Sequence, residues 1–415
     1  MRIAFWGNFG ALNFGNECTL AAAVGNMRAR LPQAELIVIC RDPADAASRH
    51  GIAALSMSRP SDPAGGRRAS KPVRALRLLG REAAAWMRAL RHASSIDALL
   101  ITGSGILSDE DEGLLGLPYE LFKWSLVTRL CGGKLFYVSV GAESISQPLS
   151  RALLKAALWL ANYRCYRDTH SAQRLQRIGF NTDNDVVRPD LAFSLPQLAA
   201  ASAVGPATEP LRHPSARFAI GLFNYRGRGQ ANDADAVAYR RYLDQICSLV
   251  ASLLAGGHHV RIVIGDFAFD EAVRVDVRSE LERRGLNLDN SSFADEPAAS
   301  FEQLLDQLAT VDFVVASRYH NVLLGLTLGK PVVSLSYEGK HEALMCTMGF
   351  SDYCQSINDL DLQRLIGQIE QLKRNADALR AVIVERVAAN RVSLKEQYDL
   401  IVSRIGADAG EGHGQ

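Results

Sequence analysis

The amino-acid sequence predicts an α/β protein of two doubly wound lobes with a central cleft. Short apolar runs alternate with helical patterns along most of the chain, which indicates parallel sheets covered by crossover helices. This alternation stops over residues 196–216, where Ala, Pro and Ser predominate. The chain has 415 residues, whereas a single hydrophobic core seldom serves more than ~250–300 residues. We therefore expect two lobes joined by a linker at 196–216.

The first half of the chain supplies the strands and helices of an N-terminal lobe. Apolar runs predict strands at residues 3–6, 35–40, 98–102, 135–140 and 164–166. Helical patterns lie between the strands, at residues 17–30, 151–161 and 169–178. Residues 1–195 are expected to form this lobe.

The same alternation restarts after the linker. Strands are predicted at residues 218–223, 260–264, 313–316 and 332–335. The helical patterns of this half lie at residues 234–255, 270–284 and 320–328. Residues 217–358 are therefore expected to form a C-terminal lobe, followed over 359–415 by a helical segment and a polar tail.

Composition excludes several classes of protein. The formal net charge is +1, which gives no general attraction to nucleic acid, so we expect no nucleic-acid partner. The seven cysteines are scattered and form no C-x-x-C pair, as is typical of reduced thiols rather than of a disulfide framework or a metal site. No apolar run reaches the roughly 18–20 residues that span a bilayer. We expect a cytoplasmic protein without a bound metal.

Glycine and asparagine follow the strands of the first lobe. The loop GNFGALNFGNE at residues 7–17 carries Asn8, Asn13, Asn16 and Glu17. Two further loops follow later strands and contain Gly103, Ser104, Gly105 and Glu143. Ligands of parallel sheets bind outside the carboxyl ends of the strands, so these loops are candidates for one site. A tight turn remains the alternative for each loop taken singly.

The second lobe carries a sharper pattern. Its predicted strand at 313–316 ends in Ser317, Arg318, Tyr319 and His320, directly before a helix. Arginine binds a carboxylate or phosphate with two parallel hydrogen bonds, and histidine exchanges a proton near neutral pH. We interpret Arg318 and His320 as the centre of an active site, rather than as a surface arginine and a histidine bonded to backbone.

Other charged residues are expected near this pair. Glu338 and Lys340 follow the next strand, as a candidate base and a candidate anion contact. Arg226 and Arg228 follow the first strand of the lobe and would add positive charge. A solvated loop is the alternative for all four.

A basic stretch at residues 67–92 stands apart from these loops. It contains eight basic residues, which are Arg67, Arg68, Lys71, Arg74, Arg77, Arg81, Arg88 and Arg91. Apolar residues recur every three or four positions, which gives an apolar face beside a basic one. Such a helix suits an anionic membrane surface, although packing of its apolar face on the first lobe is an equally ordinary arrangement.

Several motifs resemble one known family, the polysaccharide pyruvyl transferases. The motifs are GNFGALNFGNECTLAAAV, ALLITGSGIL, YRDTHSAQRLQRIGF, RPDLAFSLP, ASRYHNVLLGLTLGKPVVSLSY and EGKHEALMCTMGF. They occur in order over residues 1–355, and this order makes the resemblance more specific than any motif alone. The loop at 103–105 departs from the family, which often has a run of glycines there.

The resemblance implies two Rossmann-like lobes of GT-B type, phosphoenolpyruvate as donor substrate, no cofactor, and a pyruvate ketal on a sugar diol as product. Arg318 and His320 match the family's donor-site arginine and histidine. The expected donor-binding residues are Arg226, Arg318, Tyr319, His320, Glu338 and Lys340. The N-terminal lobe is expected to bind the acceptor, a glycan or lipid-linked sugar, through Asn8, Asn13, Asn16, Glu17, Gly103, Ser104, Gly105 and Glu143.

Two other functions remain open at this point. A GT-B glycosyltransferase that uses a sugar nucleotide would have the same two lobes. A non-catalytic glycan-binding subunit of a polysaccharide assembly complex would bind sugar without turnover. The fold alone does not decide among these functions.

Overall fold

A computed structural model describes residues 1–10, 12–57, 71–103, 105–110, 116–198, 215–224 and 233–406, except for the side chains of 71–76 and 233–235. Some residues that the sequence singles out lie outside this description. These are Arg67, Arg68, Ser104, Arg226 and Arg228, residues 199–214 of the expected linker, residues 407–415 of the polar tail, and the side chains of Lys71 and Arg74.

The chain divides into two compact units whose segments alternate along the sequence. Unit 1 consists of Met1–Ala11, Thr19–Asp190 and Glu396–Gln415. Unit 2 consists of Leu12–Cys18 and Leu191–Lys395. A short N-terminal segment therefore counts with unit 2, although the chain on either side of it counts with unit 1.

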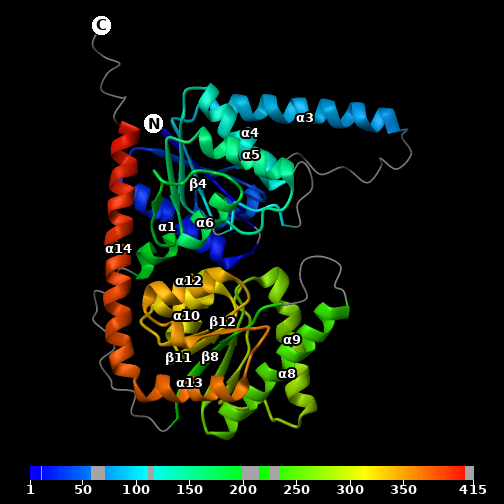
Figure 1. Cartoon of the computed structure of the whole chain (residues 1–415), viewed down its shortest axis with the longest axis vertical. Helices are drawn as coiled ribbons and strands as arrows, with labels where there is room; N and C mark the ends of the chain where they lie inside the picture. Colours follow the sequence, from blue (N-terminus) through cyan, green and yellow to red (C-terminus); the bar gives the residue numbers. More distant parts are fainter. Residues whose placement is uncertain are drawn as a thin grey trace. The chain divides into compact units, whose positions relative to one another are not determined.

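Unit 1 contains a seven-stranded, wholly parallel sheet in the order β3-β2-β1-β4-β5-β6-β7 (Figure 1). Its strands are β1 Arg2–Trp6, β2 Glu35–Cys40, β3 Ala53–Ser56, β4 Ala98–Thr102, β5 Lys134–Val140, β6 Tyr163–Tyr166 and β7 Val186–Val187. Its helices are α1 Phe14–Arg30, which counts with unit 1 from Thr19, α2 Pro43–His50, α3 Lys71–Ala93, α4 Leu117–Leu130, α5 Pro148–Trp159 and α6 Thr169–Arg177.

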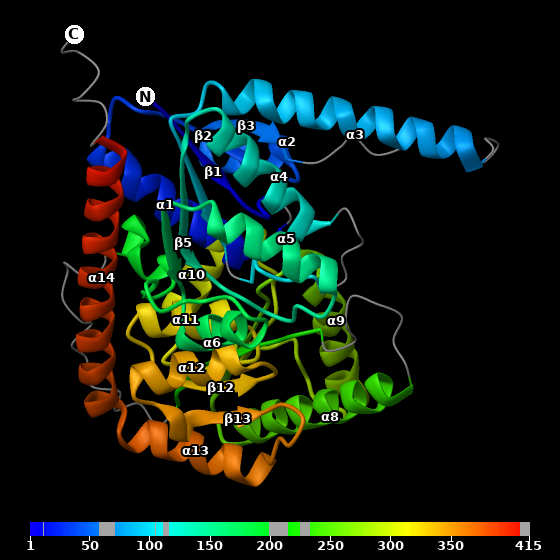
Figure 2. The ribbon, with the colours of Figure 1, turned by 45° about the horizontal axis from the view of Figure 1, so that its top comes forward.

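Helices α3, α4 and α5 lie side by side against one face of this sheet (Figures 1 and 2). The core between them includes Trp6 and Leu99 from the strands, Trp124 from α4 and Leu158 from α5. Strands β1, β4 and β5 are buried over almost their whole length because a parallel sheet is covered on both faces. This burial explains why these strands are near-continuous apolar runs in the sequence.

Unit 2 contains a six-stranded, wholly parallel sheet in the order β10-β9-β8-β11-β12-β13. Its strands are β8 Arg217–Gly221, β9 His259–Val263, β10 Phe293–Ala294, β11 Phe313–Ala316, β12 Val332–Ser336 and β13 Cys354–Ser356. Its helices are α8 Asp233–Ala255, α9 Phe267–Arg283, α10 Phe301–Ala309, α11 Tyr319–Thr327, α12 Gly339–Met348 and α13 Leu362–Arg374. Helix α14, Ala376–Gly406, counts with unit 2 up to Lys395 and with unit 1 from Glu396.

The core of unit 2 forms where α8, α9 and α13 pack on its sheet. It includes Phe218 and Val315 from the strands, Tyr242 from α8, Val277 from α9 and Ile369 from α13. Phe218 stacks on Phe313 of the neighbouring strand, with ring centroids 5.2 Å apart. The sheet therefore carries the strand ends of this unit on a packed support.

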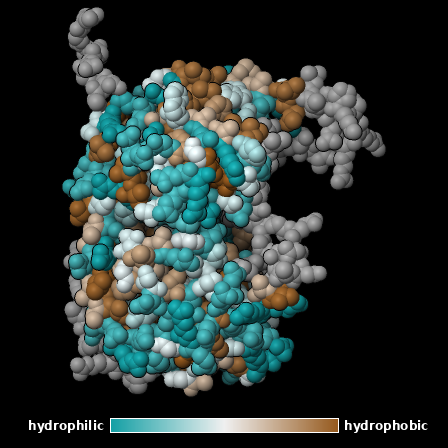
Figure 3. Space-filling model, in the orientation of Figure 1, coloured by the Kyte–Doolittle hydropathy of each residue, from teal (hydrophilic) through white to brown (hydrophobic). Residues whose placement is uncertain are grey.

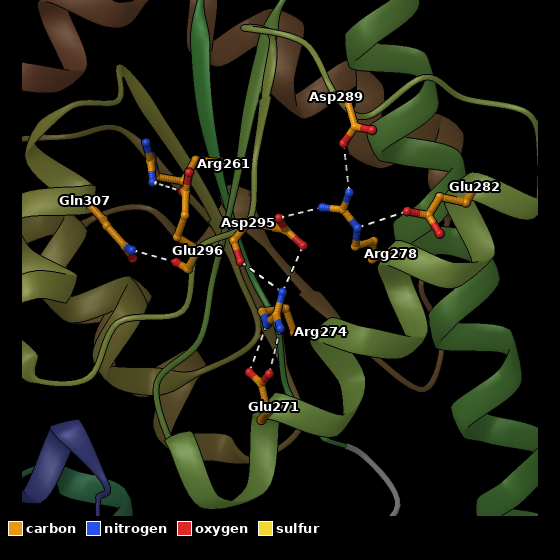
Figure 4. Close-up of polar contacts among 9 residues, drawn as sticks. All are labelled: Arg261, Glu271, Arg274, Arg278, Glu282, Asp289, Asp295, Glu296 and Gln307. Atoms are coloured by element: carbon orange, nitrogen blue, oxygen red, sulfur yellow. Dashed lines mark hydrogen bonds and ion pairs between the residues drawn. The ribbon is translucent and has the colours of Figure 1, made fainter.

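Charged side chains connect α9 to the edge of the same sheet (Figure 4). Asp295, next to β10, accepts hydrogen bonds of 2.9 Å from Arg274 and from Arg278. Arg274 also binds Glu271 of the same helix. These ion pairs fix the outer side of α9, whose first turn lies beside the candidate site described below.

Both sheets have one strand order when their strands are numbered within each unit, namely 3-2-1-4-5-6, with a seventh strand added in unit 1. This order is that of the doubly wound dinucleotide-binding folds. The expected fold class, α/β with two Rossmann-like doubly wound lobes, is confirmed. The order reverses between β1 and β4 in unit 1 and between β8 and β11 in unit 2, and such switch points open a crevice for a ligand. None of the described helices is long and apolar enough to cross a lipid bilayer.

Candidate functional site

The carboxyl ends of β8, β9, β11 and β12 bring together the polar residues of the candidate site in unit 2. Asn224 follows β8, Asp270 lies in the first turn of α9 after β9, and Arg318 directly precedes α11 after β11. Glu338 and Lys340 follow β12. The residues come from different parts of the sequence, and the strand order places them around one switch point.

Arg318 is held by a bidentate ion pair with Asp270. Its Nε donates to Oδ2 of Asp270 at 2.7 Å, and its Nη2 donates to Oδ1 at 2.6 Å. The carboxylate of Asp270 is fully buried, whereas the side chain of Arg318 is 14% exposed. The pair therefore orients an arginine whose outer part still reaches the surface of the unit.

Backbone groups complete the surroundings of Asp270. Its Oδ1 accepts the N–H of Asn224 at 3.0 Å, and its Oδ2 accepts the N–H groups of Gly265 and Asp266 at 3.3 and 3.1 Å. These bonds tie the ends of β8 and β9 to the counterion of Arg318. A buried carboxylate needs such donors because it has left water.

The guanidinium of Arg318 also lies over an aromatic ring. Its Cζ is 4.5 Å from the ring centroid of Phe223, which stacks on Tyr337 with centroids 4.1 Å apart. Burial opposes the charge of Arg318, but the attraction and hydrogen bonds of Asp270 outweigh burial and raise the pKa of the guanidinium. Asp270 uses only Nε and one N–H of Nη2, and no other acceptor is bonded to this guanidinium among the described residues. The rest of the fork can bind an external anion.

His320 lies in the first turn of α11, two residues after Arg318. The residue is buried, and its ring meets Tyr319 edge-on with centroids 5.1 Å apart. The backbone of Gly15 contacts the ring so closely that a Cβ atom at Gly15 would overlap Nδ1 of His320. Glycine at this position therefore makes room for the imidazole.

The segment Leu12–Cys18 is bound to the loop between β9 and α9. The N–H of Phe14 donates to the carbonyl of Gly265 at 3.1 Å, and the N–H of Phe267 donates to the carbonyl of Leu12 at 3.1 Å. The side-chain Nδ2 of Asn13 donates to Oδ2 of Asp266 at 3.0 Å. These bonds place the start of α1 beside the ends of the unit 2 strands.

Asn13 also begins helix α1. Its Oδ1 accepts the N–H groups of Gly15 and Asn16 at 3.1 and 3.3 Å, which is the bonding of an N-cap residue. Both polar ends of the Asn13 side chain thus have partners within the protein. Asn16 and Glu17, in the first turn of α1, are buried.

The residues after β12 form a second charged group. Nζ of Lys340 lies 2.9 Å from Oε2 of Glu338 and 5.0 Å from the ring centroid of Tyr337. His341, next along α12, is fully buried and shares a hydrogen bond of 2.9 Å with Oγ of Ser334. Tyr337 links this group to Arg318, because Tyr337 stacks on the ring that lies beneath the guanidinium.

Unit 1 carries its own group of residues at strand ends. Asn8 follows β1, Gly103 and Gly105 follow β4, and Glu143 follows β5. Gly105 has a positive φ of 74°, and a Cβ atom there would overlap the carboxylate of Glu143. The loops after β4 and β5 are therefore in contact, because these two strands are neighbours in the sheet.

Several residues of these two groups escaped sequence reasoning. In unit 2 they are Asp270, Phe223 and Asn321, whose carboxamide is fully buried without a hydrogen-bond partner among the described residues. In unit 1, Arg167 is buried after β6 and lies 3.0 Å from Asp168 and 3.8 Å from Asp190. Position gives a signal for Arg167, because it directly follows a predicted strand, whereas Asp270 is the first residue of a predicted helix. An aromatic stack or a buried amide leaves no comparable pattern.

Two doubly wound parallel sheets place the chain among the α/β proteins of GT-B-like fold. A charged pair at the switch point of the second sheet adds a candidate site for an anionic ligand. The family model described as polysaccharide pyruvyl transferase matches residues 13–339. The chain belongs to this family, which the motifs had suggested, and the name of the family indicates an enzyme.

Solved structures share the fold at low sequence identity. UDP-GlcNAc 2-epimerase from Neisseria meningitidis has a TM-score of 0.60 and 12% identity, with 97% of this chain and 99% of that chain covered. Anabaena HepE, solved in complex with UDP and glucose, has a TM-score of 0.58, 13% identity and the same two coverages. A Rickettsia africae glycosyltransferase has a TM-score of 0.58 and 10% identity, with 97% and 98% covered. Among curated proteins, none matches this chain.

Proposed function

We propose that the protein transfers pyruvate from phosphoenolpyruvate to two hydroxyl groups of a sugar, as a ketal, with release of phosphate. The acceptor in this proposal is a polysaccharide or its lipid-linked precursor. Membership of the family supports the reaction. The observation that carries it for this chain is the fixed guanidinium of Arg318, two residues from a buried histidine.

Arg318 would bind the donor. Phosphoenolpyruvate carries a carboxylate and a phosphate, and either group fits the two N–H directions of a guanidinium. Asp270 fixes the orientation of this guanidinium before the donor arrives, so little reorganisation is needed on binding. Tyr319, Glu338 and Lys340 are proposed to complete the donor side, together with Arg226, which lies outside the described residues.

His320 would supply the proton. In the proposed reaction its imidazolium protonates the methylene carbon of phosphoenolpyruvate, and the adjacent carbon becomes electrophilic. One sugar hydroxyl attacks that carbon and loses its proton, and the C–O bond to phosphate breaks. The second hydroxyl then closes the ketal, and the two hydroxyl protons balance the new methyl group and the released phosphate. Proton transfer from a positioned group contributes about 10²–10⁴-fold to such reactions.

The acceptor is proposed to bind through the residues at the strand ends of unit 1 and at the start of α1. These are Asn8, Asn13, Asn16, Glu17, Gly103, Gly105 and Glu143, with Ser104 outside the described residues. Their amide and carboxylate groups suit the hydroxyls of a sugar.

Thermal unfolding with phosphoenolpyruvate tests the donor and its site. A ligand at 100 times its dissociation constant stabilises the folded state by about 2.7 kcal/mol. We expect phosphoenolpyruvate to raise the midpoint of the wild type and of the control Arg283→Ala, which removes an exposed arginine of α9. The rise should be lost in Arg318→Ala, and His320→Ala should keep the rise but release phosphate at least 10²-fold more slowly.

Other outcomes would contradict the proposal in distinct ways. A midpoint raised by a sugar nucleotide but not by phosphoenolpyruvate would favour a glycosyltransferase. Glycan binding without phosphate release from phosphoenolpyruvate would favour a non-catalytic subunit. Near-normal turnover in His320→Ala would remove this histidine from the chemistry.

A further inference from the structure

Helix α3 extends beyond the part of unit 1 that it packs against. Its 23 residues correspond to about 34 Å of helix. The second half packs on α4 through Ala85, Ala89 and Ala93, which are buried at intervals of four residues. In Figure 1 and Figure 2 the other half continues past α4 and α5.

A hydrogen-bonded chain fixes the packed half. Nε1 of Trp86 donates to the hydroxyl of Tyr119 at 2.7 Å, and this hydroxyl donates to Oε1 of Glu82 at 2.6 Å. Nζ of Lys123 lies 3.8 Å from the same carboxylate. Helix α3 is therefore anchored on α4, and its direction is set by this contact.

The sides of α3 that do not contact α4 expose large apolar residues. Leu79 is 67% exposed, Met87 61% and Leu90 38%, whereas Leu78, 47% exposed, points to the side of the packed alanines. Leu79, Met87 and Leu90 lie on one side of the helix at 100° per residue, next to the packed alanines. Three large apolar side chains on one side of a helix form a patch, whereas exposed apolar residues ordinarily occur singly on a protein surface.

Arginines line the neighbouring side of the helix. Arg77, Arg81, Arg88 and Arg91 project within one arc of α3, and the only acid on the helix, Glu82, is bound to Tyr119. The pKa of His92, near the end of α3, is lowered first by burial and then by the positive charges of Arg91, Arg88 and Arg2. In Figure 3 hydrophobic and hydrophilic residues lie side by side along this edge of the molecule.

We propose that α3 is a docking surface for an anionic lipid membrane. A helix with an apolar arc beside an arginine-rich arc lies in the interface of such a membrane, its apolar side chains in the acyl boundary and its arginines at the phosphates. The sequence left open whether the apolar face is used entirely for packing on the first lobe. Among the described side chains, packing takes the alanines and Trp86 and leaves Leu79, Met87 and Leu90 outside.

A second copy of the chain fits this surface less well. A symmetric contact through α3 would bring the same arginines of two copies together, since an isologous interface pairs one patch with itself. The single acid of the helix is already bound within unit 1. Lipid phosphates supply the negative charge that α3 lacks.

This proposal deepens the proposed function, on which the following step rests. Membrane binding increases the rate of a peripheral enzyme most when its substrate is confined to the same membrane, because the local concentrations of enzyme and substrate are then both raised. Docking through α3 therefore points to the lipid-linked form of the sugar acceptor. Membrane binding itself does not depend on the identity of the reaction.

Cosedimentation with vesicles of known composition tests the docking. We would use phosphatidylcholine vesicles with about one third phosphatidylglycerol, which mimics an anionic surface. Each arginine near such a surface contributes about fivefold to partitioning, so Arg77→Glu with Arg88→Glu should lower it by about 25-fold or more. Leu79→Gln with Met87→Gln should lower it by at least about tenfold through the loss of apolar contact.

Control variants separate this effect from net charge and folding. Arg177→Glu with Arg364→Glu makes the same change in charge at exposed sites on α6 and α13, and should leave partitioning within about twofold. All variants should keep the wild-type midpoint of unfolding and the wild-type turnover of phosphoenolpyruvate with a water-soluble sugar diol. Failure of docking is thereby distinguished from failure of the proposed reaction.

Three outcomes would overturn the proposal. Partitioning that is unchanged in both α3 variants would remove α3 from the contact. Equal binding to pure phosphatidylcholine would remove the role of the arginines. A change of oligomeric mass in Leu79→Gln with Met87→Gln, without vesicle binding by the wild type, would show that a second copy covers the helix.

Discussion

Replacement of Asp270 by asparagine tests whether the carboxylate holds Arg318 in place. The substitution keeps the size of the side chain but removes the counterion of a guanidinium whose side chain is 14% exposed. An amide also presents only one acceptor oxygen, whereas the two carboxylate oxygens accept five hydrogen bonds here. The variant therefore leaves a largely buried charge uncompensated.

The size of the effect follows from this burial. Removal of one partner of a buried ion pair typically costs about 3–5 kcal/mol. For a unit of about 200 residues, each kcal/mol shifts the midpoint by roughly 2–4 °C, which gives a decrease of about 6–20 °C. A guanidinium free to move by about 1 Å should also reduce kcat/KM for phosphoenolpyruvate by about 10²-fold.

Differential scanning calorimetry and phosphate release measure the two effects. Glu282→Gln serves as the control, because it breaks an exposed ion pair with Arg278 on the same helix and should cost less than about 1 kcal/mol. Asp270→Asn combined with Arg318→Met should recover part of the lost stability without recovering activity, since the buried charge is gone. A single Asp270→Asn variant that melts and turns over like the wild type would refute the role assigned to the pair.

Two further predictions concern Gly15 and Glu280. Gly15→Ala should slow phosphate release and lower the free energy of unfolding by about 1–3 kcal/mol, because its Cβ overlaps the ring of His320. The control Gly367→Ala has open space around its Cβ and should raise the free energy of unfolding by up to about 1 kcal/mol. Equal effects of the two substitutions would refute the contact between Gly15 and His320. Hydrogen bonds from Arg283 and Arg284 lower the pKa of Glu280 from 4.5 to about 2. A carboxyl group whose pKa is lower in the folded state than in the unfolded state stabilises the folded state at pH values above its unfolded pKa. This contribution should be lost in thermal melts as the pH falls from about 4.5 to 2, and it should be absent from Glu280→Gln.

Much of the fold could be predicted from the sequence because its central strands are buried on both faces. Strands β1, β2 and β4 are near-continuous apolar runs with a polar residue only at one end, and such runs bounded by turns indicate strands of a parallel sheet. Edge strands carry less signal. β3 is the four residues AALS, which are only partly buried, and β10 is a pair of residues, so neither was predicted.

The candidate site could be predicted only where the type and position of a residue together indicate its chemical role. Arg318 and His320 follow a clear strand, and the polarity of that position suggests a site. Asp270 belongs to an ordinary helical pattern, and its role depends on its contact with Arg318, which lies 48 residues further along the chain. The N-cap role of Asn13 was also missed, so α1 begins at Phe14 rather than at the predicted residue 17. Long-range partners of this kind are fixed by the strand order, which the sequence does not state.

The segment Leu12–Cys18 has a consequence for how the protein is made and divided. Residues that bind the β9–α9 loop of unit 2 are synthesised early, since Cys18 precedes Leu191, where the rest of that unit begins, by 191 − 18 = 173 residues. A fragment that starts at β8 would lack the partners of Gly265 and Asp266 and the glycine that faces His320. The second half of the chain is therefore no independent module, and its transplantation between relatives would have to carry a few residues from the far end of the gene.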